Sequence, residues 1–206
     1  MIRSFPAVLA AALALSAASG APAQVQVQAQ AQAQAQAPAG GRAPSLADRI
    51  INTPRPDALY VSRTLQPRPV LRDEPSVQGG KALRIATPAD APNAWTVLAS
   101  SAIKRPVATG DELVLAFWAR LIEGEGGDET IVLPSNAIRL AAAPYTALIS
   151  GRAEVGRDWA LHEVRGVAGR DYAAGEILAV LHLSSGQHTL ELGPVFVLDM
   201  GPAGSR

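Results

Sequence analysis

The sequence predicts an all-β fold, a sandwich of two sheets, and three observations support this prediction. Apolar and polar residues alternate in many short segments, which is typical of strands with one buried face. Glycine and proline turns separate these segments. Almost no segment has the 3.6-residue period of an amphipathic helix. Nothing repeats at a fixed longer period, so the pattern does not indicate a propeller or a solenoid.

The segment Asp111–Arg120 (DELVLAFWAR) is predicted to be a central strand of this sandwich. Successive side chains of a strand point to opposite faces, so the segment divides into two sets. The set expected in the core is Leu113, Leu115, Phe117 and Ala119. The opposite set is Val114, Ala116, Trp118 and Arg120. Because a guanidinium is not buried without a partner, this second face is expected to meet water at its Arg120 end.

Residues 1–23 have the features of a secretory signal peptide. Arg3 supplies the positive charge, Ala7–Ala18 the apolar run, and Ala21–Ala23 (APA) a small-residue cleavage site before Gln24. The apolar run is shorter than the roughly 20 residues that span a bilayer. The chain has no cysteine, so no acylated thiol tethers it and no disulfide staples it. We expect a secreted or periplasmic protein without a membrane span.

Residues 24–44 form a low-complexity Ala/Gln linker, and residues 45–202 are predicted to be the β-sandwich domain. The linker has no large apolar side chain and therefore nothing to bury. Formal charge balances, with 18 Lys and Arg against 18 Asp and Glu. No basic stripe with interleaved aromatic residues is present, so nucleic acid is not an expected partner.

The elements follow in order from local signals. Ser45 is predicted to cap a short helix start, with Asp48 at its third position. The connector Gln66–Pro75 is broken by proline and is not expected to run through the interior of a sheet. The other predicted strands, each an alternating apolar run, are Ala58–Leu65, Lys81–Thr87, Trp95–Ile103, Thr130–Leu133 with Ala137–Leu140, Thr146–Glu154, Asp158–Val167, Ile177–Ser184 and His188–Met200.

Several of these segments share the pattern of a known family. Their landmarks are the strand ending FWAR (Phe117–Arg120), then PYT (Pro144–Thr146), then DW (Asp158–Trp159), then AG (Ala174–Gly175) and the closing LELGPVFVLDMG (Leu190–Gly201). From Gly79 to Gly201 the chain resembles the carbohydrate-binding modules of families 4, 9 and 22. The resemblance implies a jelly-roll sandwich of the galactose-binding-like type. It also implies a polysaccharide or oligosaccharide ligand and, as a partner, a secreted glycoside hydrolase.

The resemblance nominates three of the candidate binding residues. Trp95 matches a tryptophan on which some members stack a sugar ring. His182 stands where some members place a carboxylate, and Gln187 stands at a position that is often glutamine. The simpler alternatives are that Trp95 is a core residue or a loop lid, that His182 is structural, and that Gln187 is an ordinary polar turn residue.

The strand pattern nominates the other three. Trp118 and Arg120 share one strand face, where a ring and guanidinium donors could meet a sugar. If the strand of His182 lies in the same sheet, it and Arg120 look onto one surface. The alternative is that Arg120 makes a cation–π or carboxylate contact that only covers the sheet. Tyr145 adds a ring at the rim, or packs against the end of the sandwich.

The sequence holds no recognisable catalytic or metal-binding constellation. The nucleophile-elbow, zinc-protease and phosphate-loop motifs are absent, and the three histidines lack helical ligand spacing. The acidic residues of the loop Glu123–Glu129 are read as a solvated turn, with a structural calcium ion as the alternative. Trp159 is predicted to be a core residue. No catalytic residue and no cofactor are therefore expected.

The function predicted from these observations is an exported, non-catalytic carbohydrate-binding module that recognises a polysaccharide on a shallow aromatic and polar sheet face. Two alternatives stay open. One is a structural or protein-interaction sandwich without sugar binding. The other is an activity on glycosyl bonds, which would need a pair of positioned carboxylates.

Overall fold

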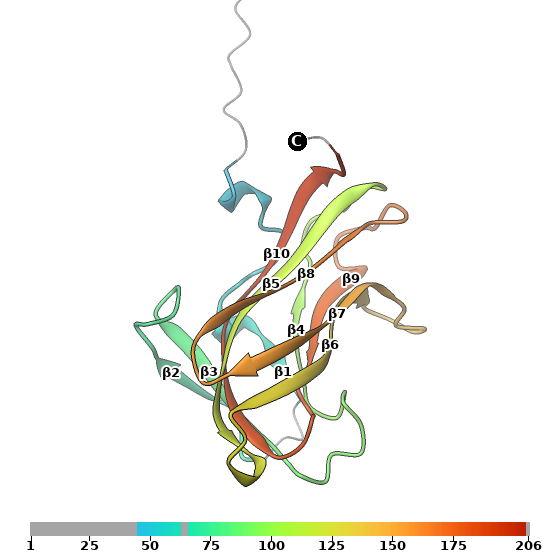
Figure 1. Cartoon of the computed structure of the whole chain (residues 1–206). Coiled ribbons are helices and arrows are strands. Elements are labelled where there is room, and N and C mark those ends of the chain that lie inside the picture. The colour runs from blue at the N-terminus through green and yellow to red at the C-terminus, as the bar shows by residue number, and fades with distance from the viewer. Residues whose placement is uncertain (1–44, 63–65, 205–206) are drawn as a thin grey trace, which may run out of the picture. The chain divides into compact units, whose positions relative to one another are not determined.

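Two five-stranded antiparallel sheets pack face to face and enclose one apolar core (Figure 1). The computed structural model describes residues 45–62 and 66–204, so the predicted signal peptide and linker lie outside the described residues. Sheet A has the strand order β2-β3-β10-β5-β8, and sheet B has the order β1-β4-β9-β6-β7. The predicted all-β jelly-roll sandwich is confirmed.

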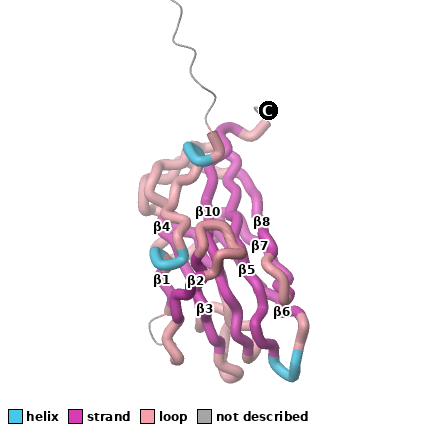
Figure 2. The backbone as a smooth tube through the Cα atoms, turned by 90° about the vertical axis from the view of Figure 1, so that its left-hand side faces the viewer, coloured by secondary structure: helices cyan, strands magenta, loops and turns pink. Residues whose placement is uncertain are grey.

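The strands of sheet A are β2 (Val70–Asp73), β3 (Lys81–Thr87), β5 (Asp111–Gly124), β8 (Ala160–Val167) and β10 (His188–Pro202). The strands of sheet B are β1 (Tyr60–Val61), β4 (Leu98–Ala102), β6 (Thr130–Leu140), β7 (Ala147–Gly156) and β9 (Ile177–His182). Short 3-10 helices are η1 (Ala47–Arg49), η2 (Pro56–Ala58) and η3 (Glu125–Gly127). Figure 2 shows that helix is confined to short turns beside the strands. Among the described residues, no helix has the length and hydropathy needed to cross a bilayer.

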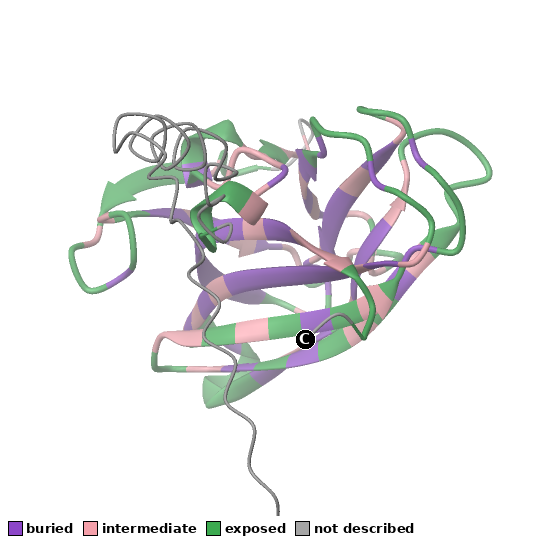
Figure 3. Cartoon of the chain, turned by 90° about the horizontal axis from the view of Figure 1, so that it is seen from above, coloured by how far each residue is buried: buried purple, intermediate pink, exposed green. Residues whose placement is uncertain are grey.

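The predicted facing of the central strand is confirmed. Its core set, Leu113, Leu115, Phe117 and Ala119, is fully buried between the sheets. On the opposite face Trp118 and Arg120 are only partly buried. In Figure 3 the buried segments concentrate in the strands and the exposed ones in the connecting loops. Burial of one strand face therefore fixes which side chains of β5 point outward.

The longest pairing in the sandwich joins β5 to β10, and its register shifts at three places. One of these shifts lies between Leu192 and Val195, around Gly193 and Pro194. A β-carbon on Gly193 would lie 2.9 Å from the β-carbon of Trp118 and 2.9 Å from a methyl of Val77. The absence of a side chain at Gly193 thus lets Trp118 lie close against β10.

The structure adds one strand and corrects two of the predicted elements. The connector Gln66–Pro75 contains β2, which pairs with β3; β2 is an edge strand, in keeping with the expectation that this segment does not run through the interior of a sheet. Of the strand predicted over 58–65, only Tyr60 and Val61 pair in the described residues, and residues 63–65 are not described. Thr130–Leu140 is one strand, β6, with a register shift near Pro134 instead of two segments.

A short turn lies where the helix start was predicted, but Ser45 is not its cap: η1 begins after Leu46 without a side-chain cap, so Asp48 is its second residue and not its third. The Ser45 hydroxyl donates to the Asp48 carboxylate at 2.7 Å, and the Ser45 backbone N–H donates to the same oxygen at 2.9 Å. The turn that follows is η1, and its neighbour Ile50 packs on the outer side of sheet A against Leu198. This turn therefore ties the start of the described chain to sheet A.

Candidate functional site

The six predicted binding residues divide between the two outer faces and one end of the sandwich. Trp118 and Arg120 belong to β5 of sheet A, whereas His182 belongs to β9 of sheet B. Both strands turn their apolar alternates into the shared core, so these three side chains point to opposite sides of the molecule. The expectation that His182 and Arg120 share a surface is wrong, because their strands lie in different sheets.

On sheet A, Arg120 is held by carboxylates. Its Nε and Nη2 donate to one oxygen of Glu191 at 2.9 and 2.7 Å, and Nη2 also donates to Glu74 at 2.6 Å. The guanidinium carbon lies 4.9 Å from the ring centroid of Trp159. Arg120 therefore makes the cation–π and carboxylate contacts that we considered as the alternative to sugar binding.

Glu191 is the centre of this ion-pair cluster. It is 1% exposed, and its second oxygen accepts from Nε and Nη2 of Arg84 at 3.0 and 2.7 Å. Arg72 lies further out, at 3.7 Å. The position predicted for Trp159 is wrong: it is partly buried beneath Arg120 on the outer side of sheet A, and it is not part of the core between the sheets. The alternation of β8, extended back by one residue, places Trp159 with the exposed Leu161, Glu163 and Arg165, so the strand pattern itself contains this signal.

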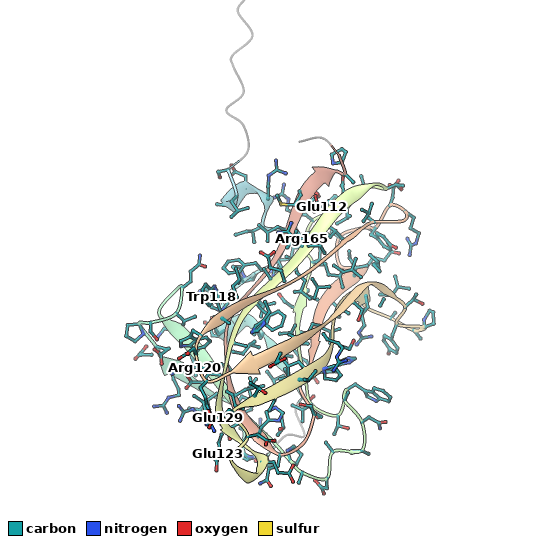
Figure 4. The ribbon with its side chains drawn as sticks, viewed as in Figure 1. Glu112, Trp118, Arg120, Glu123, Glu129 and Arg165 are labelled. Atoms are coloured by element: carbon teal, nitrogen blue, oxygen red, sulfur yellow. The ribbon has the colours of Figure 1, made fainter. Side chains whose placement is uncertain are left out.

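Figure 4 shows how the labelled side chains are distributed along the length of the sandwich. Glu112 and Arg165 lie near one end of the sandwich, Trp118 and Arg120 lie further along, and Glu123 and Glu129 lie at the other end. A hollow of about 390 Å³ lies beside the first pair, between η1 and the outer face of sheet A. Its walls are mostly apolar, and none of the six predicted binding residues lines it.

On sheet B, a ring pair joins Trp95 and His182. Trp95 lies in the loop before β4 and is 59% exposed. Its ring centroid is 6.5 Å from that of His182, with the planes at 60°, an edge-to-face arrangement. The register places Leu98 of β4 directly opposite His182, so the loop that carries Trp95 ends at the strand beside the histidine. Trp95 is therefore an exposed ring, not a core residue.

A second pair on the same face joins Arg139 and Tyr145. The guanidinium carbon of Arg139, on β6, lies 4.7 Å from the ring centroid of Tyr145, in the loop between β6 and β7. Tyr145 is 54% exposed, with a backbone φ of 57° that presents its side chain from a tight turn. Sequence analysis did not single out Arg139, because an outward charge between Ile138 and Leu140 is ordinary in a strand.

Tyr60 adds a third exposed ring to this face. It is 48% exposed and alternates with Leu59 and Val61, which pack on the core. Across the middle of this side of sheet B the strand register places Ser100, Val180, Ala137 and Ser150 side by side, of which Val180 and Ala137 are buried and Ser150 is exposed. We call the surface formed by Tyr60, Trp95, Arg139, Tyr145 and His182 the aromatic face.

Electrostatics favours a neutral histidine on the aromatic face. Burial lowers the pKa of His182, and the positive charge of Arg139 lowers it further. A neutral imidazole has one donor and one acceptor nitrogen. His182 can therefore accept a hydrogen bond from one sugar hydroxyl and donate one to another.

Gln187 lies at one end of the sandwich, in the segment between β9 and β10. It is exposed and borders a hollow of about 210 Å³ with Glu123, Glu125 and His188. Its backbone N–H donates to the Glu125 carboxylate at 3.3 Å. In the described part of the chain, no group of three or more His, Cys, Asp or Glu side chains is arranged to hold a metal ion.

Together, the two sheets and their strand order define the class: this is the jelly-roll fold of carbohydrate-binding modules. A structure described as "CBM4 structure and function" superposes with a TM-score of 0.52 at 17% identity, over 70% of this chain and 96% of that one. The C-terminal family 22 module of Clostridium thermocellum Xyn10B gives 0.51 at 11% identity, over 78% and 99%. The tandem family 22 modules of Paenibacillus barcinonensis Xyn10C give 0.51 at 12%, over 75% of this chain and 47% of that one.

These similarities confirm the predicted resemblance at the level of the fold. No protein-family model and no curated protein matches the sequence. What the surface binds therefore has to be argued from its own residues.

Proposed function

We propose that the protein is a non-catalytic polysaccharide-binding module and that the aromatic face of sheet B is its binding surface. The observation that carries this proposal is the grouping of exposed rings, Tyr60, Trp95 and Tyr145, with His182 and Arg139 on one face. A pyranose ring has an apolar C–H face and a rim of hydroxyls. Flat aromatic plates flanked by fixed polar groups are complementary to both.

Each member of the face has a distinct role in this proposal. Trp95 stacks on a sugar ring at one end, while His182 exchanges hydrogen bonds with its hydroxyls. Tyr145 and Arg139 act at the other end. The register pairs Arg139 with Leu178, four residues from His182, so at ~3.3 Å per residue the backbone positions are about 13 Å apart along the strands. Because the aromatic contacts lie at both ends of this stretch, we propose that the ligand is an oligosaccharide segment.

The remaining predicted residues have no part in this face. The donors of Arg120 are taken up by Glu191 and Glu74, and Trp118 lies on the opposite sheet. Gln187 lies at the end of the sandwich. The proposal thus keeps Trp95, His182 and Tyr145 and adds Arg139 and Tyr60.

The state of the carboxylates supports a role in binding without catalysis. Glycoside hydrolysis needs one carboxylic acid kept protonated and a second carboxylate several ångströms away. In the described residues the buried carboxylates are Asp111 and Glu191. Asp111 accepts the Ala108 N–H at 2.9 Å, and Glu191 is bound by arginines. Export and association with a secreted glycoside hydrolase belong to the same proposal and rest on the sequence.

The test is a titration with β-glucans, xylans and mannans, followed by tryptophan emission and by calorimetry. At least one polysaccharide should bind, and Trp95→Ala should weaken it about tenfold or more, the size of a central aromatic contact. Because Trp95 is exposed, its removal should leave the melting temperature unchanged. Trp118→Phe, on the opposite sheet, is the matched control and should bind normally.

A flat response across the whole panel would refute the proposal. The protein would then be better described by the alternative, a structural or protein-interaction sandwich. Release of chromophore from chromogenic glycosides above the buffer rate would contradict the non-catalytic assignment.

A further inference from the structure

Arg139 differs from Arg84 and Arg120, the partly buried arginines on the strands of sheet A, and from Arg49, whose guanidinium donates to backbone carbonyls. Arg84 and Arg120, on sheet A, are both paired with Glu191. Arg139 has no ion pair among the described residues, its Nε is buried without a hydrogen-bond partner, and its contact is with the ring of Tyr145. A partly buried cation without a carboxylate is costly unless a ligand supplies one.

Among residues 45–62 and 66–204, no ion pair neutralises Arg139. The closest carboxylate in the strand register is Glu176, beside Ile177, which pairs with Leu140. Glu176 already accepts from Arg170 at 2.6 Å and from the Ala173 N–H at 2.9 Å. The positive potential of Arg139 therefore persists on the face, where it also acts on the pKa of His182.

Other charges on this side of sheet B do not cancel it. On β7 the outward alternates of the buried Ala153 and Val155 are Arg152 and Glu154, one of each sign. Glu154 pairs with Val132, on the far side of the register shift in β6. That part of β6 does not pair with β9, the strand that carries His182. Within the aromatic face itself, Arg139 is the charged residue.

The contact with Tyr145 orients the guanidinium. Stacking on a ring restrains the planar group while its edge donors stay available, and that fork matches a carboxylate in two parallel hydrogen bonds. A uronic acid carries such a carboxylate directly on a pyranose ring. One sugar unit can therefore meet the guanidinium and the neighbouring aromatic ring together.

We propose that the aromatic face recognises an acidic polysaccharide, with the carboxylate of a uronic acid residue bound by Arg139 beside Tyr145. This inference rests on the proposed function and specifies its ligand class. Neutral stretches of the same chain occupy Trp95 and His182, and the acid group fixes the position of the chain on the face.

The experiment compares matched polymers with the full-length protein by calorimetry. The first pair is a glucuronic-acid-substituted xylan and the same polymer after carboxyl reduction, which removes the charge and keeps the backbone. The second pair is polygalacturonate and its methyl ester. The acidic member of at least one pair should bind about tenfold more tightly, and this advantage should shrink from 50 to 500 mM NaCl.

Three variants test whether Arg139 causes the preference for the acidic polymer. Arg139→Gln should remove the preference for the acidic polymer and leave binding of its reduced form. Arg139→Lys should retain part of the preference, because it keeps the charge and loses the fork. Arg165→Gln removes the same charge from the opposite sheet and should retain the full preference.

The outcomes separate the two proposals. Equal binding of acidic and reduced polymers would overturn this inference and leave the proposed function standing. Binding of neither would overturn both. A preference that survives in folded Arg139→Gln also overturns the inference. Because the polymer comparison and its salt dependence use the unmodified protein, the result does not depend on the folding of any variant.

Discussion

Replacing Glu191 with Gln tests whether the ion-pair cluster on sheet A holds that sheet together. Glu191 is 1% exposed and accepts N–H groups from Arg84 and Arg120 at 2.7 to 3.0 Å. A glutamine has the same shape, but it loses the charge and turns an NH₂ group toward one of the guanidinium groups. The variant therefore leaves the packing intact and removes the charge complementarity.

The expected loss of stability depends on how deeply Glu191 and its two arginine partners are buried. Removing one partner of a fully buried pair costs about 3–5 kcal/mol. Here the arginine side chains are 24% and 34% exposed and can recover part of their hydration. We therefore expect the free energy of unfolding to fall by about 2–3 kcal/mol, which for a domain of this size is a decrease in melting temperature of roughly 4–12 °C.

The assay is urea unfolding followed by tryptophan emission, with thermal melting as a second readout. The urea midpoint should fall without a change in the slope of the transition. The control is Asp73→Asn, which breaks the exposed pair with Lys81, and it should leave the midpoint unchanged. If Glu191→Gln unfolds at the same urea concentration as the control, Glu191 does not stabilise sheet A and the reasoning fails.

Three further predictions concern the core and its protonation. Phe117→Ala should lower the free energy of unfolding by about 3–5 kcal/mol in the urea assay, since Phe117 is fully buried; a loss below that of a surface substitution would contradict the predicted strand facing. Gly166→Ala would place a β-carbon 2.1 Å from a methyl of Ile149 and should cost about 1–3 kcal/mol; the double variant with Ile149→Ala should lose less than the sum of the single losses. Burial lowers the pKa of His188, against a smaller opposing effect of nearby backbone groups, so the unfolded chain takes up the proton first as the pH falls. The contribution of His188 to the free energy of unfolding is therefore fully present above the unfolded pKa of about 6.5 and is lost toward pH 5, and the melting temperature should fall over the same range. If the melting temperature of His188→Gln falls equally steeply, other groups cause the effect.

The strands and their facing were largely predictable, because they follow from local alternation. Lys81–Thr87 is a strand with the predicted bounds, and the core set of β5 is buried as expected. The strand that was not predicted and the residue that was placed wrongly also have local explanations. β2 was not predicted because prolines flank it, and an edge strand tolerates such neighbours. Trp159 was placed in the core because its type favours burial, whereas a cation covers it on the outside.

The candidate site was predictable only in part. Alternation indicates that His182 and Arg120 both point away from the core, but it cannot say that β9 and β5 belong to different sheets. The contact between Trp95 and His182 joins segments that are far apart in the sequence, and the contact of Arg139 with Tyr145 depends on how the turn after β6 folds back. Arg139 carries no local signal, since an outward arginine is the usual occupant of a strand's exposed position.

The sequence by itself determined which side chains are hidden and which are presented, because a strand has a period of two and one face must be buried. Only the tertiary structure decided which presented side chains share a face. Sheet membership arises from pairing between distant strands, and this pairing places Trp95, His182, Arg139 and Tyr145 on one side and Arg120 with its carboxylates on the other. The physical reason is that hydrophobic burial acts on each strand locally, whereas the choice of neighbour depends on the whole chain.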